Sequence, residues 1–391
     1  MLERLLTSSG ENAGACFSGK TAQVTMAAEY AKRMLVLSVG YGQGHHAAGI
    51  ALVEHYVASG WNARMVDVCA DACPGLFYLT QAFYRVCVRK VPWLWGVTYS
   101  LADTADWACL VRNPVFRPVL RRLQMLLQEF KPDLIVCTYP LFAYMLEALG
   151  NSSPYVMLVT DAREISRPWM RSKAPLVIVP DEVSARVMRE RYDYDELVLV
   201  PAGFPVGKSF TPSVERNAPT DESLRILYGA YRRYGGVVAD VEAMLCEFPH
   251  AKLTVLAGQY AKRLRRVFEP FCRQGRLTII QETDQMSDLL GTCHLYIGKA
   301  GAATMFECYA SNVPAIVNYT LPGQEQGNLE LLLQDGAGYH AESTTHLMQI
   351  LRSLISDGAA GWHALCDSMQ RSGRSGAVER IAQTIDRRFG W

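Results

Sequence analysis

The architecture of this chain is clearest in residues 34–68, MLVLSVGYGQGHHAAGIALVEHYVASGWNARMVDV. The apolar run 34–39 is typical of a buried strand, and a glycine-rich loop follows it. Apolar residues at helical spacing then predict a helix over 47–59, and a second strand is expected at 63–68. A strand, helix and strand in this order belong to a parallel sheet, because such crossovers are right-handed.

The loop between this strand and this helix suits two different chemistries. Residues 42–47 fit the dinucleotide pattern G-x-G-x-x-[GA], and Asp67 ends the second strand, as that pattern requires. His45 and His46, however, stand where a pyrophosphate would need bare backbone N–H groups. An imidazole near its ordinary pKa can take a proton from a hydroxyl. We therefore expect His45 to be a general base, with solvated or capping histidines as the alternative.

Length and composition describe the wider chain. At 391 residues, half of them apolar and a fifth charged, the sequence predicts two globular domains rather than a disordered chain. The formal net charge of +1 provides no global field for nucleic acid or an anionic membrane. The longest uncharged apolar-rich run, Leu134–Leu146, is too short to span a bilayer and contains Pro140.

Eleven cysteines without a C-x-x-C pair indicate reduced core thiols rather than a disulfide framework or a zinc site. We expect no metal and no cofactor. Residues 1–32 are predicted to be a flexible extension without a secretion signal. Residues 14–21 fit the P-loop string G-x-x-x-x-G-K-[ST], but the polar stretch before them cannot form the strand that such a loop needs.

An aromatic and basic segment follows the first unit. Trp93, Trp95 and Tyr99 lie close together, and arginines flank them from Tyr84 to Arg122. Aromatic rings beside cationic side chains suit the headgroup level of a bilayer. The alternative is a helical hairpin packed in the core.

Two further strands are predicted at 133–138 and 155–159. The second ends in Thr160 and Asp161. Residues at the ends of parallel strands face the ligand crevice, so Asp161 is a candidate for acid–base or orienting work. Its alternative is a helix cap or turn residue.

A second unit repeats the alternation of strands and helices. Residues 203–222 have the composition of a linker, and strands are predicted at 224–228, 252–257 and 277–280. The fold class is therefore α/β, with two doubly wound, Rossmann-like halves facing across a cleft. Clefts of this kind hold ligands between the halves.

The richest chemistry in the second unit is in two loops. Residues 298–307, GKAGAATMFE, form a small-residue turn that feeds a helix with Glu307 one turn in. Small residues at a helix start fit a diphosphate, and a carboxylate can accept from the two ribose hydroxyls. Gln324, Glu325 and Asn328 offer several donors and acceptors for a sugar. These loops predict a nucleotide-sugar site.

Six motifs recur in order in one known family: 44–45, 92–99, 160–161, 203–210, 298–307 and 322–328. On these motifs the chain resembles the monogalactosyldiacylglycerol synthases and the bacterial processive diacylglycerol glucosyltransferases, relatives of the enzyme that forms lipid II. The resemblance covers roughly residues 33–388. It implies a GT-B fold, inverting transfer without a catalytic metal, and peripheral attachment to the cytoplasmic face of the cell membrane.

The same resemblance implies roles for single residues. His45 matches the base and Asp161 a supporting acidic position. Independently of the resemblance, we expect the start of the helix at 301–304 to stabilise the charge on the leaving diphosphate, assisted by Lys299 or by Arg232 and Arg233. The implied nucleotide-sugar residues are Met286, Lys299, Gly301, Ala302, Ala303, Thr304, Glu307, Gln324, Glu325 and Asn328; the implied acceptor and membrane residues are Trp93, Trp95 and Tyr99. The chain departs from the family at 229–236, in lacking a histidine within 162–169, and at His294.

The resulting prediction is an inverting transfer of a hexose from a UDP-sugar to a hydroxyl of a membrane lipid, in first place 1,2-diacylglycerol. The expected division is an extension at 1–32, an acceptor domain at 33–210, a nucleotide-sugar domain at 211–375, and a last helix within 376–391 that packs back on the first domain. The expected partners are UDP-hexose, the lipid and a membrane surface, without nucleic acid. The alternatives are a UDP-sugar epimerase, a non-catalytic UDP-binding protein of GT-B shape and an NAD-dependent oxidoreductase.

Overall fold

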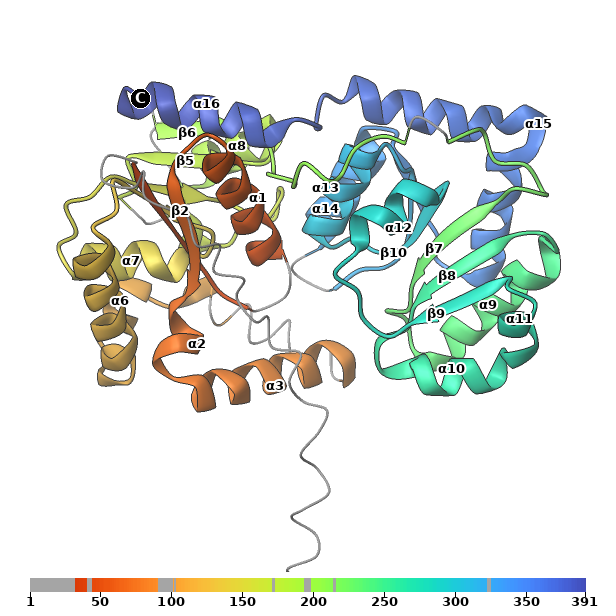
Figure 1. The fold of residues 1–391 in the computed structure, drawn as a ribbon, viewed down its shortest axis with the longest axis horizontal. Helices are drawn as coiled ribbons and strands as arrows, with labels where there is room; N and C mark the ends of the chain where they lie inside the picture. The colour runs from red at the N-terminus through yellow and green to blue at the C-terminus, as the bar shows by residue number, and fades with distance from the viewer. Residues whose placement is uncertain are drawn as a thin grey trace, which may run out of the picture.

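The computed structural model describes residues 32–40, 44–90, 101, 103–170, 173–192, 198–213, 216–321 and 325–391. These residues form two parallel sheets of six strands each, and helices cover both sheets (Figure 1). We call each sheet with its surrounding helices a domain. The predicted α/β class with two doubly wound halves is confirmed.

The first sheet has the strand order β2-β1-β3-β4-β5-β6, and all of its pairs are parallel. Its strands are β1 (Arg33–Ser38), β2 (Asn62–Asp67), β3 (Leu134–Cys137), β4 (Tyr155–Leu158), β5 (Leu176–Val179) and β6 (Leu199–Pro201). Its helices are α1 (Gly44–Ala58), α2 (Val68–Ala72), α3 (Pro74–Lys90), α5 (Trp107–Leu110), η1 (Pro114–Phe116), α6 (Arg117–Phe130), α7 (Pro140–Ala148), η2 (Arg167–Met170) and α8 (Glu182–Tyr192). Every residue of β3, β4 and β5 is buried, as expected of central strands covered on both faces.

The second sheet has the strand order β12-β11-β10-β7-β8-β9. Its strands are β7 (Arg225–Gly229), β8 (Lys252–Leu256), β9 (Leu277–Ile280), β10 (Leu295–Lys299), β11 (Ala315–Tyr319) and β12 (Gly338–His340). The helices after β7 are α9 (Tyr234–Glu247), η4 (Gly258–Tyr260), α10 (Ala261–Val267), α11 (Glu269–Arg273), α12 (Met286–Thr292), α13 (Ala302–Ser311), α14 (Gln326–Gln334), α15 (Thr344–Arg371) and α16 (Ala377–Phe389). The strands of both sheets therefore end towards loops that lead into helices, which is where parallel sheets place ligands.

The last helix returns to the first domain. α15 lies along the second domain and α16 along the first (Figure 1). Tyr56 of α1 donates its hydroxyl proton to Asp386 at 3.2 Å, and the Arg380 guanidinium donates to the Ala202 carbonyl at 3.3 Å. Gly203 has a φ of +108°, and a Cβ there would lie 2.7 Å from that of Ala377, so glycine alone allows this close approach.

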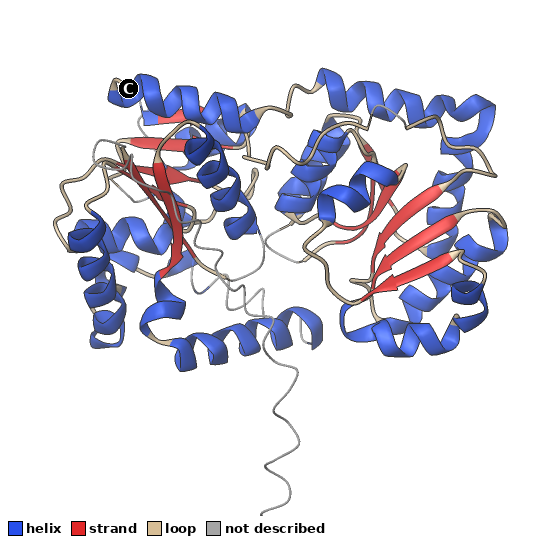
Figure 2. Ribbon diagram, viewed as in Figure 1, coloured by secondary structure: helices blue, strands red, loops and turns tan. Residues whose placement is uncertain are grey.

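The two domains pack directly against each other between their sheets (Figure 2). The rings of Phe204 and Phe306 stack with centroids 4.9 Å apart, and residues of α1 and α13 belong to one continuous apolar cluster. Arg216, in the segment between the sheets, donates to carbonyls at the carboxyl ends of α12 and α13, among them Leu290 at 2.9 Å and Asn312 at 2.9 Å. This one guanidinium therefore complements two helix ends.

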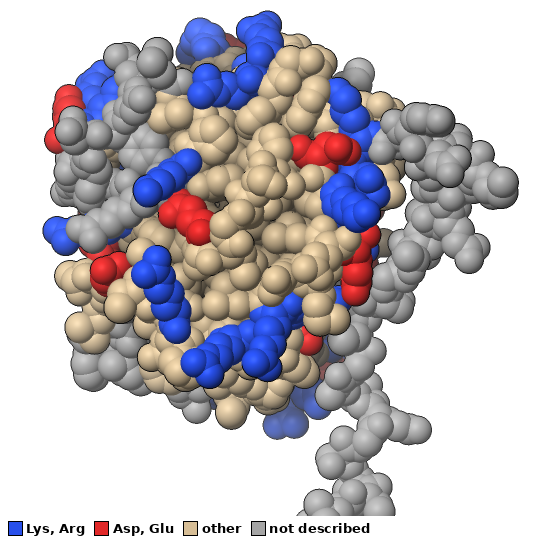
Figure 3. All heavy atoms as spheres, turned by 90° about the vertical axis from the view of Figure 1, so that its left-hand side faces the viewer, with Lys and Arg blue, Asp and Glu red and all other residues tan. Residues whose placement is uncertain are grey.

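The charged surface is mixed. On the face of the first domain seen in Figure 3, basic and acidic side chains are interspersed around a broad area that carries neither. Among the helices that the structure describes, none is long and apolar enough to cross a membrane.

Candidate functional site

The predicted base lies in the first turn of a helix. α1 begins at Gly44, three residues before the predicted start, so His45 is helical rather than part of the loop. It is 7% exposed, and its Nδ1 lies 2.8 Å from the Thr160 hydroxyl oxygen. Burial lowers the pKa of His45 to about 4, although the Thr138 carbonyl favours the charged ring. The expected imidazole near its ordinary pKa is therefore wrong, because packing removes this ring from water.

Asp161 contacts the same tryptophan, Trp169, that lies beside His45. Its carboxylate accepts a hydrogen bond from the Trp169 indole at 2.9 Å, and the Trp169 ring centroid is 6.3 Å from that of His45. Burial raises the pKa of Asp161 to about 6, against the Trp169 hydrogen bond, which favours the ionised form. The structure thus gathers both predicted residues around Trp169. The direct partner of His45 is Thr160, which follows β4 just before Asp161.

Asp67 holds the backbone of its own domain. Its carboxylate accepts the N–H groups of Gly40 and Ala70, each at 2.9 Å, and it caps α2. The Nε2 of His46 lies 3.8 Å from the same carboxylate. These contacts give Asp67 a structural role. The dinucleotide pattern instead predicts that this carboxylate binds the ribose of a cofactor. Gly42 and Gln43 of that pattern lie outside the described residues.

The start of α13 is open to an anion. Gly301 is its N-cap and makes no side-chain capping bond, so the first-turn N–H groups of Ala302, Ala303 and Thr304 have no side-chain acceptor from the cap. Such N–H groups, with the positive end of the helix dipole, form an anion site. This is the position that the sequence predicts for the diphosphate.

Two polar side chains beside this helix start have unused hydrogen-bonding capacity. Glu307 makes no hydrogen bond with any described residue, and burial raises its pKa to about 7. Asn328 is 3% exposed and donates to the Ala300 carbonyl at 2.9 Å. Its Oδ1 atom is buried without a partner within the described part of the chain. A buried acceptor left open in this way suits a ligand hydroxyl.

Lys299 and Glu325 are paired with each other. Lys299 Nζ lies 2.6 Å from Glu325 Oε1, and the second carboxylate oxygen accepts the Leu321 N–H at 3.0 Å. The sequence assigns the lysine to the diphosphate and the glutamate to the sugar, and it does not predict the ion pair. Burial explains the pair, because Glu325 is 4% exposed and a buried carboxylate requires a nearby cation.

The predicted role of Arg232 is not supported. Its guanidinium donates to both oxygens of Asp240, at 2.8 and 2.9 Å. Asp240 is fully buried and also accepts from Tyr228 at 2.7 Å, from Asn318 at 3.1 Å and from Thr344 at 2.6 Å. Arg232 thus neutralises a buried carboxylate, whereas Arg233 is exposed.

Other predicted residues are placed more simply. Met286 begins α12 and packs, partly buried, on the apolar cluster shared by the domains. Trp93, Trp95, Tyr99 and Gln324 lie outside the described residues, as does the P-loop string at 14–21. The cysteines that the structure describes are free thiols. No described group of three or more His, Cys, Asp or Glu residues could hold a metal ion.

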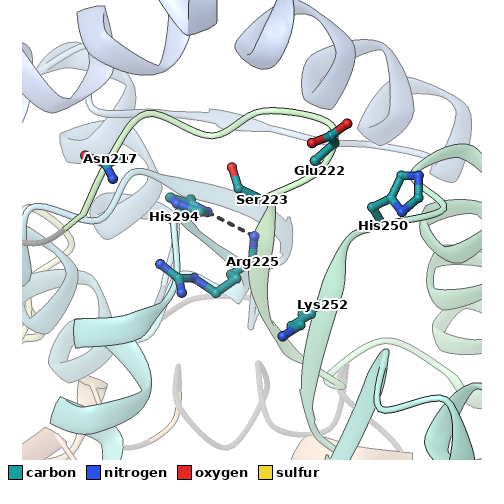
Figure 4. Close-up of a pocket in the computed structure, with 7 residues that line it drawn as sticks. All are labelled: Asn217, Glu222, Ser223, Arg225, His250, Lys252 and His294. Atoms are coloured by element: carbon teal, nitrogen blue, oxygen red, sulfur yellow. Dashed lines mark hydrogen bonds between the residues drawn. The ribbon is translucent and has the colours of Figure 1, made fainter.

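A separate hollow lies away from this site. It has a volume of about 300 Å³ and opens where β7 and β8 begin, at the opposite end of the strands (Figure 4). The Arg225 N–H donates there to His294 Nδ1 at 2.9 Å, and the His294 carbonyl accepts from Trp362 at 2.9 Å. Burial lowers the pKa of His294 to about 4. The histidine that departs from the family pattern is therefore a structural residue.

Comparison with known families supports the likeness seen in the sequence. Residues 45–206 match the model described as monogalactosyldiacylglycerol (MGDG) synthase, and residues 235–371 match the glycosyltransferase family 28 C-terminal domain. The chain is 24% identical to monogalactosyldiacylglycerol synthase 2 of Arabidopsis thaliana, over 93% of this chain and 82% of that one. It is 24% identical to the processive diacylglycerol beta-glucosyltransferase of Staphylococcus carnosus, over 64% of this chain and 66% of that one.

Solved structures share the fold. MnaA of S. aureus, determined with UDP, has a TM-score of 0.59 at 14% identity and covers 91% of this chain and 96% of its own. MurG of Acinetobacter baumannii has a TM-score of 0.58 at 12% identity and covers 91% of this chain and 99% of its own. The two-domain architecture is that of GT-B glycosyltransferases.

Proposed function

We propose that this chain, which belongs to the monogalactosyldiacylglycerol synthase family of GT-B glycosyltransferases, transfers a hexose from a UDP-sugar to a hydroxyl of a membrane lipid, and that this lipid is 1,2-diacylglycerol. The observation that carries the proposal is the open carboxyl of Glu307, one turn into a helix whose first N–H groups have no side-chain cap. A nucleoside diphosphate offers one group for each: the diphosphate for the N–H groups and the ribose diol for the carboxylate.

The remaining donor contacts follow from the same loops. Asn328 Oδ1 accepts from a sugar hydroxyl, because it has no donor among the described residues. Glu325 and Lys299 form a charged pair at the edge of the diphosphate site, where they orient the sugar and meet leaving-group charge. Met286, at the start of α12, lies beside the uracil, and Gln324 joins the sugar contacts. Two structures in the fold comparison, MnaA of S. aureus and HepE of Anabaena, were determined with UDP.

His45 is the proposed general base. In the tautomer with the proton on Nδ1, the ring donates to the Thr160 hydroxyl oxygen, and the lone pair that can accept a proton is on Nε2. Nε2 takes the proton of the lipid hydroxyl while that oxygen bonds to the anomeric carbon, and the bond from that carbon to the UDP oxygen breaks with inversion. The pKa of about 4 keeps His45 neutral at pH 7, and we assign stabilisation of the imidazolium as it forms to the carboxylate of Asp161, which shares Trp169 with His45.

The leaving UDP is stabilised without a metal in this proposal. Negative charge on the diphosphate meets the N–H groups of residues 302–304 and the positive end of the α13 dipole. These donors are already in place on a helix, so they require no reorganisation during the reaction. The protein side supplies both proton transfer and charge stabilisation, and UDP-hexose is a co-substrate rather than a cofactor.

Helix α3 supports a membrane-bound acceptor. It lies apart from the first sheet, along the lower edge of the molecule in Figure 1. Leu76, Leu79 and Phe83 fall at helical spacing on it and are each half exposed or more. An apolar stripe of this kind inserts into the headgroup and acyl boundary. We place the protein at the cytoplasmic face of the membrane, where UDP-sugars are available, with Trp93, Trp95 and Tyr99 near the lipid.

One experiment tests donor and acceptor together. The protein is incubated with radiolabelled UDP-glucose, UDP-galactose or UDP-N-acetylglucosamine and diacylglycerol micelles, and the lipid is extracted. Labelled lipid is the expected result, and the effective nucleotide identifies the sugar. Conversion of the UDP-sugar in lipid-free buffer would instead indicate an epimerase, and UDP binding without turnover a non-catalytic protein. Thermal stabilisation by NAD but not by UDP would indicate the oxidoreductase.

A further inference from the structure

The turn after Asp161 has a strained backbone. The Glu164 N–H donates to the Ala162 carbonyl at 2.7 Å, and Arg163 between them has a φ of +64°. A three-residue turn with a positive φ at its centre is rare for L-residues. It persists only where surrounding contacts enforce it. The contacts of Arg163 therefore help to decide where the neighbouring Asp161 lies.

Arg163 is held by the start of α8. Its N–H donates to the Ser184 hydroxyl at 2.9 Å, and its Nε and Nη2 both lie 3.3 Å from Asp181 Oδ2. Asp181 also accepts the Ser184 N–H at 2.8 Å. The side chains of Arg163 and Asp181 are only 9% and 8% exposed. Exposed ion pairs contribute little, but a buried pair leaves a costly unpaired charge when one partner is removed.

A second arginine brings the other domain to the same carboxylate. Arg374 lies between the end of α15 and the start of α16, and its Nη2 is 3.8 Å from Asp181 Oδ2. The same guanidinium binds Asp335 through Nε and through Nη2, the latter at 3.0 Å. Asp335 follows the last residue of α14 and also accepts from Tyr309 of α13 at 2.6 Å. The carboxyl end of α14 is thus joined to Arg163 through two charged side chains.

The amino end of α14 touches the same turn. A Cβ on Gly327 would lie 2.0 Å from the Ala162 carbonyl oxygen and 2.9 Å from the Glu164 nitrogen, so the two backbones are in contact. Glu325 is the N-cap of this helix and Asn328 lies in its first turn. One helix, which carries two proposed sugar contacts, is therefore attached at both ends to the turn that follows Asp161.

We propose that Arg163, Asp181, Arg374 and Asp335 form an interdomain clamp that fixes Asp161 relative to the sugar-binding end of α14. The inference rests on the proposed function, since the clamp serves to align the acceptor-side carboxylate with the donor-side loop. The four side chains are positioning residues. They fix the position of the acceptor side of the site relative to the donor side. This position matters because a displacement of about 1 Å can slow a reaction by 100-fold.

The first test measures the clamp without any substrate. Amide hydrogen exchange is followed in peptides covering 161–166 and 326–334 for the native protein, Arg374→Gln and Arg163→Gly; glycine adopts the positive φ without strain. The matched control is Arg371→Gln, an exposed arginine at the end of α15, three residues before Arg374, whose guanidinium bonds only Ser368 among the described residues. We expect exchange in both peptides to rise about tenfold in the two clamp variants and not in the control. Exchange at the control rate in either peptide would overturn the clamp.

The second test asks whether the clamp positions the reaction. In the clamp variants kcat for lipid glycosylation should fall about tenfold while the KM for UDP-hexose stays within twofold, and Arg374→Lys should restore part of kcat. Faster exchange with kcat unchanged would overturn the positioning role. A native protein that transfers no sugar would refute the proposed function, and the exchange result would still decide the clamp.

Discussion

The Nδ1 atom of His45, in the first turn of α1, lies 2.8 Å from the hydroxyl oxygen of Thr160, directly beyond β4. The hydroxyl orients the imidazole, and the Tyr139 ring packs edge-on against it at 5.2 Å. Both elements belong to the same domain. The proposed base is therefore fixed on rigid secondary structure, with its Nδ1 held at the Thr160 hydroxyl.

Replacing the two partners should affect turnover by different amounts. His45→Ala removes the base and should lower kcat about 10²–10⁴-fold, whereas Thr160→Val removes only the orienting hydroxyl and should lower it about 10–100-fold. Calorimetric binding of UDP should stay within twofold in both variants. Thr278→Val, at an exposed position on β9, is the control. A Thr160→Val enzyme with native kcat would refute the orienting role.

Glu307 should make stability depend on pH. Its pKa is about 7 in the folded protein against 4.5 for the ordinary group, so the folded state binds the proton more tightly. Its contribution to stability is full below pH 4.5 and is lost as pH rises through 7. Urea denaturation should find Glu307→Gln more stable than the native protein by roughly 2–3 kcal/mol at pH 8 and equally stable at pH 4. Exposed Glu330→Gln should show no such difference, and a constant difference for Glu307→Gln would contradict the assignment.

A methyl group at Gly327 should separate the domains locally. The added Cβ would meet the Ala162 carbonyl, so Gly327→Ala should reduce the free energy of unfolding by roughly 1–3 kcal/mol and lower kcat. Gly291→Ala, at a helical glycine with nothing within 4 Å of its Cβ position, should instead gain about 0.5–1 kcal/mol. Urea denaturation measures both, and equal effects would argue against a close contact at Gly327.

Charges on α3 should weaken membrane binding. Leu79→Glu with Phe83→Glu removes two exposed apolar side chains, and sedimentation with diacylglycerol-containing anionic vesicles should fall at least about tenfold. The control is Val267→Glu, an exposed apolar residue on α10 of the other domain. Unchanged sedimentation of the double variant would remove α3 from the membrane contact.

The buried Asp240 should be a major contributor to stability. Asp240→Ala leaves the Arg232 guanidinium without its carboxylate, so the free energy of unfolding should fall by about 3–5 kcal/mol. Glu242→Ala, an exposed acid on the same helix, should change it by less than about 0.5 kcal/mol. Comparable losses in the two variants, measured by urea denaturation, would show that the buried network is not the cause.

The repeated strands and helices could be predicted because the spacing of apolar residues, and the glycines and prolines that end each element, are local features of the sequence. The strand at 34–39 and the helix that follows it are both present, although α1 begins at Gly44 instead of residue 47. Tertiary packing explains the earlier start of the helix. The sequence predicted His45 to lie in a loop because histidine is polar, but in the structure this residue is helical and buried against Thr160. Hydrophobic pattern alone does not reveal a polar side chain that is buried with a partner.

Side-chain partners could not be predicted in the same way. Lys299 and Glu325 were each assigned to a ligand, yet they lie 2.6 Å apart, and Arg232 is bound to Asp240. Each pair joins residues from different elements, so no spacing within one helix or strand reveals it. The pKa of His45 depends likewise on burial, which only the folded chain determines. The glycine-rich helix start at 301, in contrast, could be recognised because its chemistry lies in consecutive backbone groups.

The return of α16 has a consequence for the order in which the protein folds during synthesis. Its residues Ile381 and Ile385 are fully buried in the cluster that also contains Met34 of β1 and Leu52 of α1. A ribosome makes these early elements first and α16 only after the whole second sheet. The first domain therefore leaves the ribosome with the apolar residues that α16 later covers still exposed, and its folding is completed after the domain that follows it in sequence.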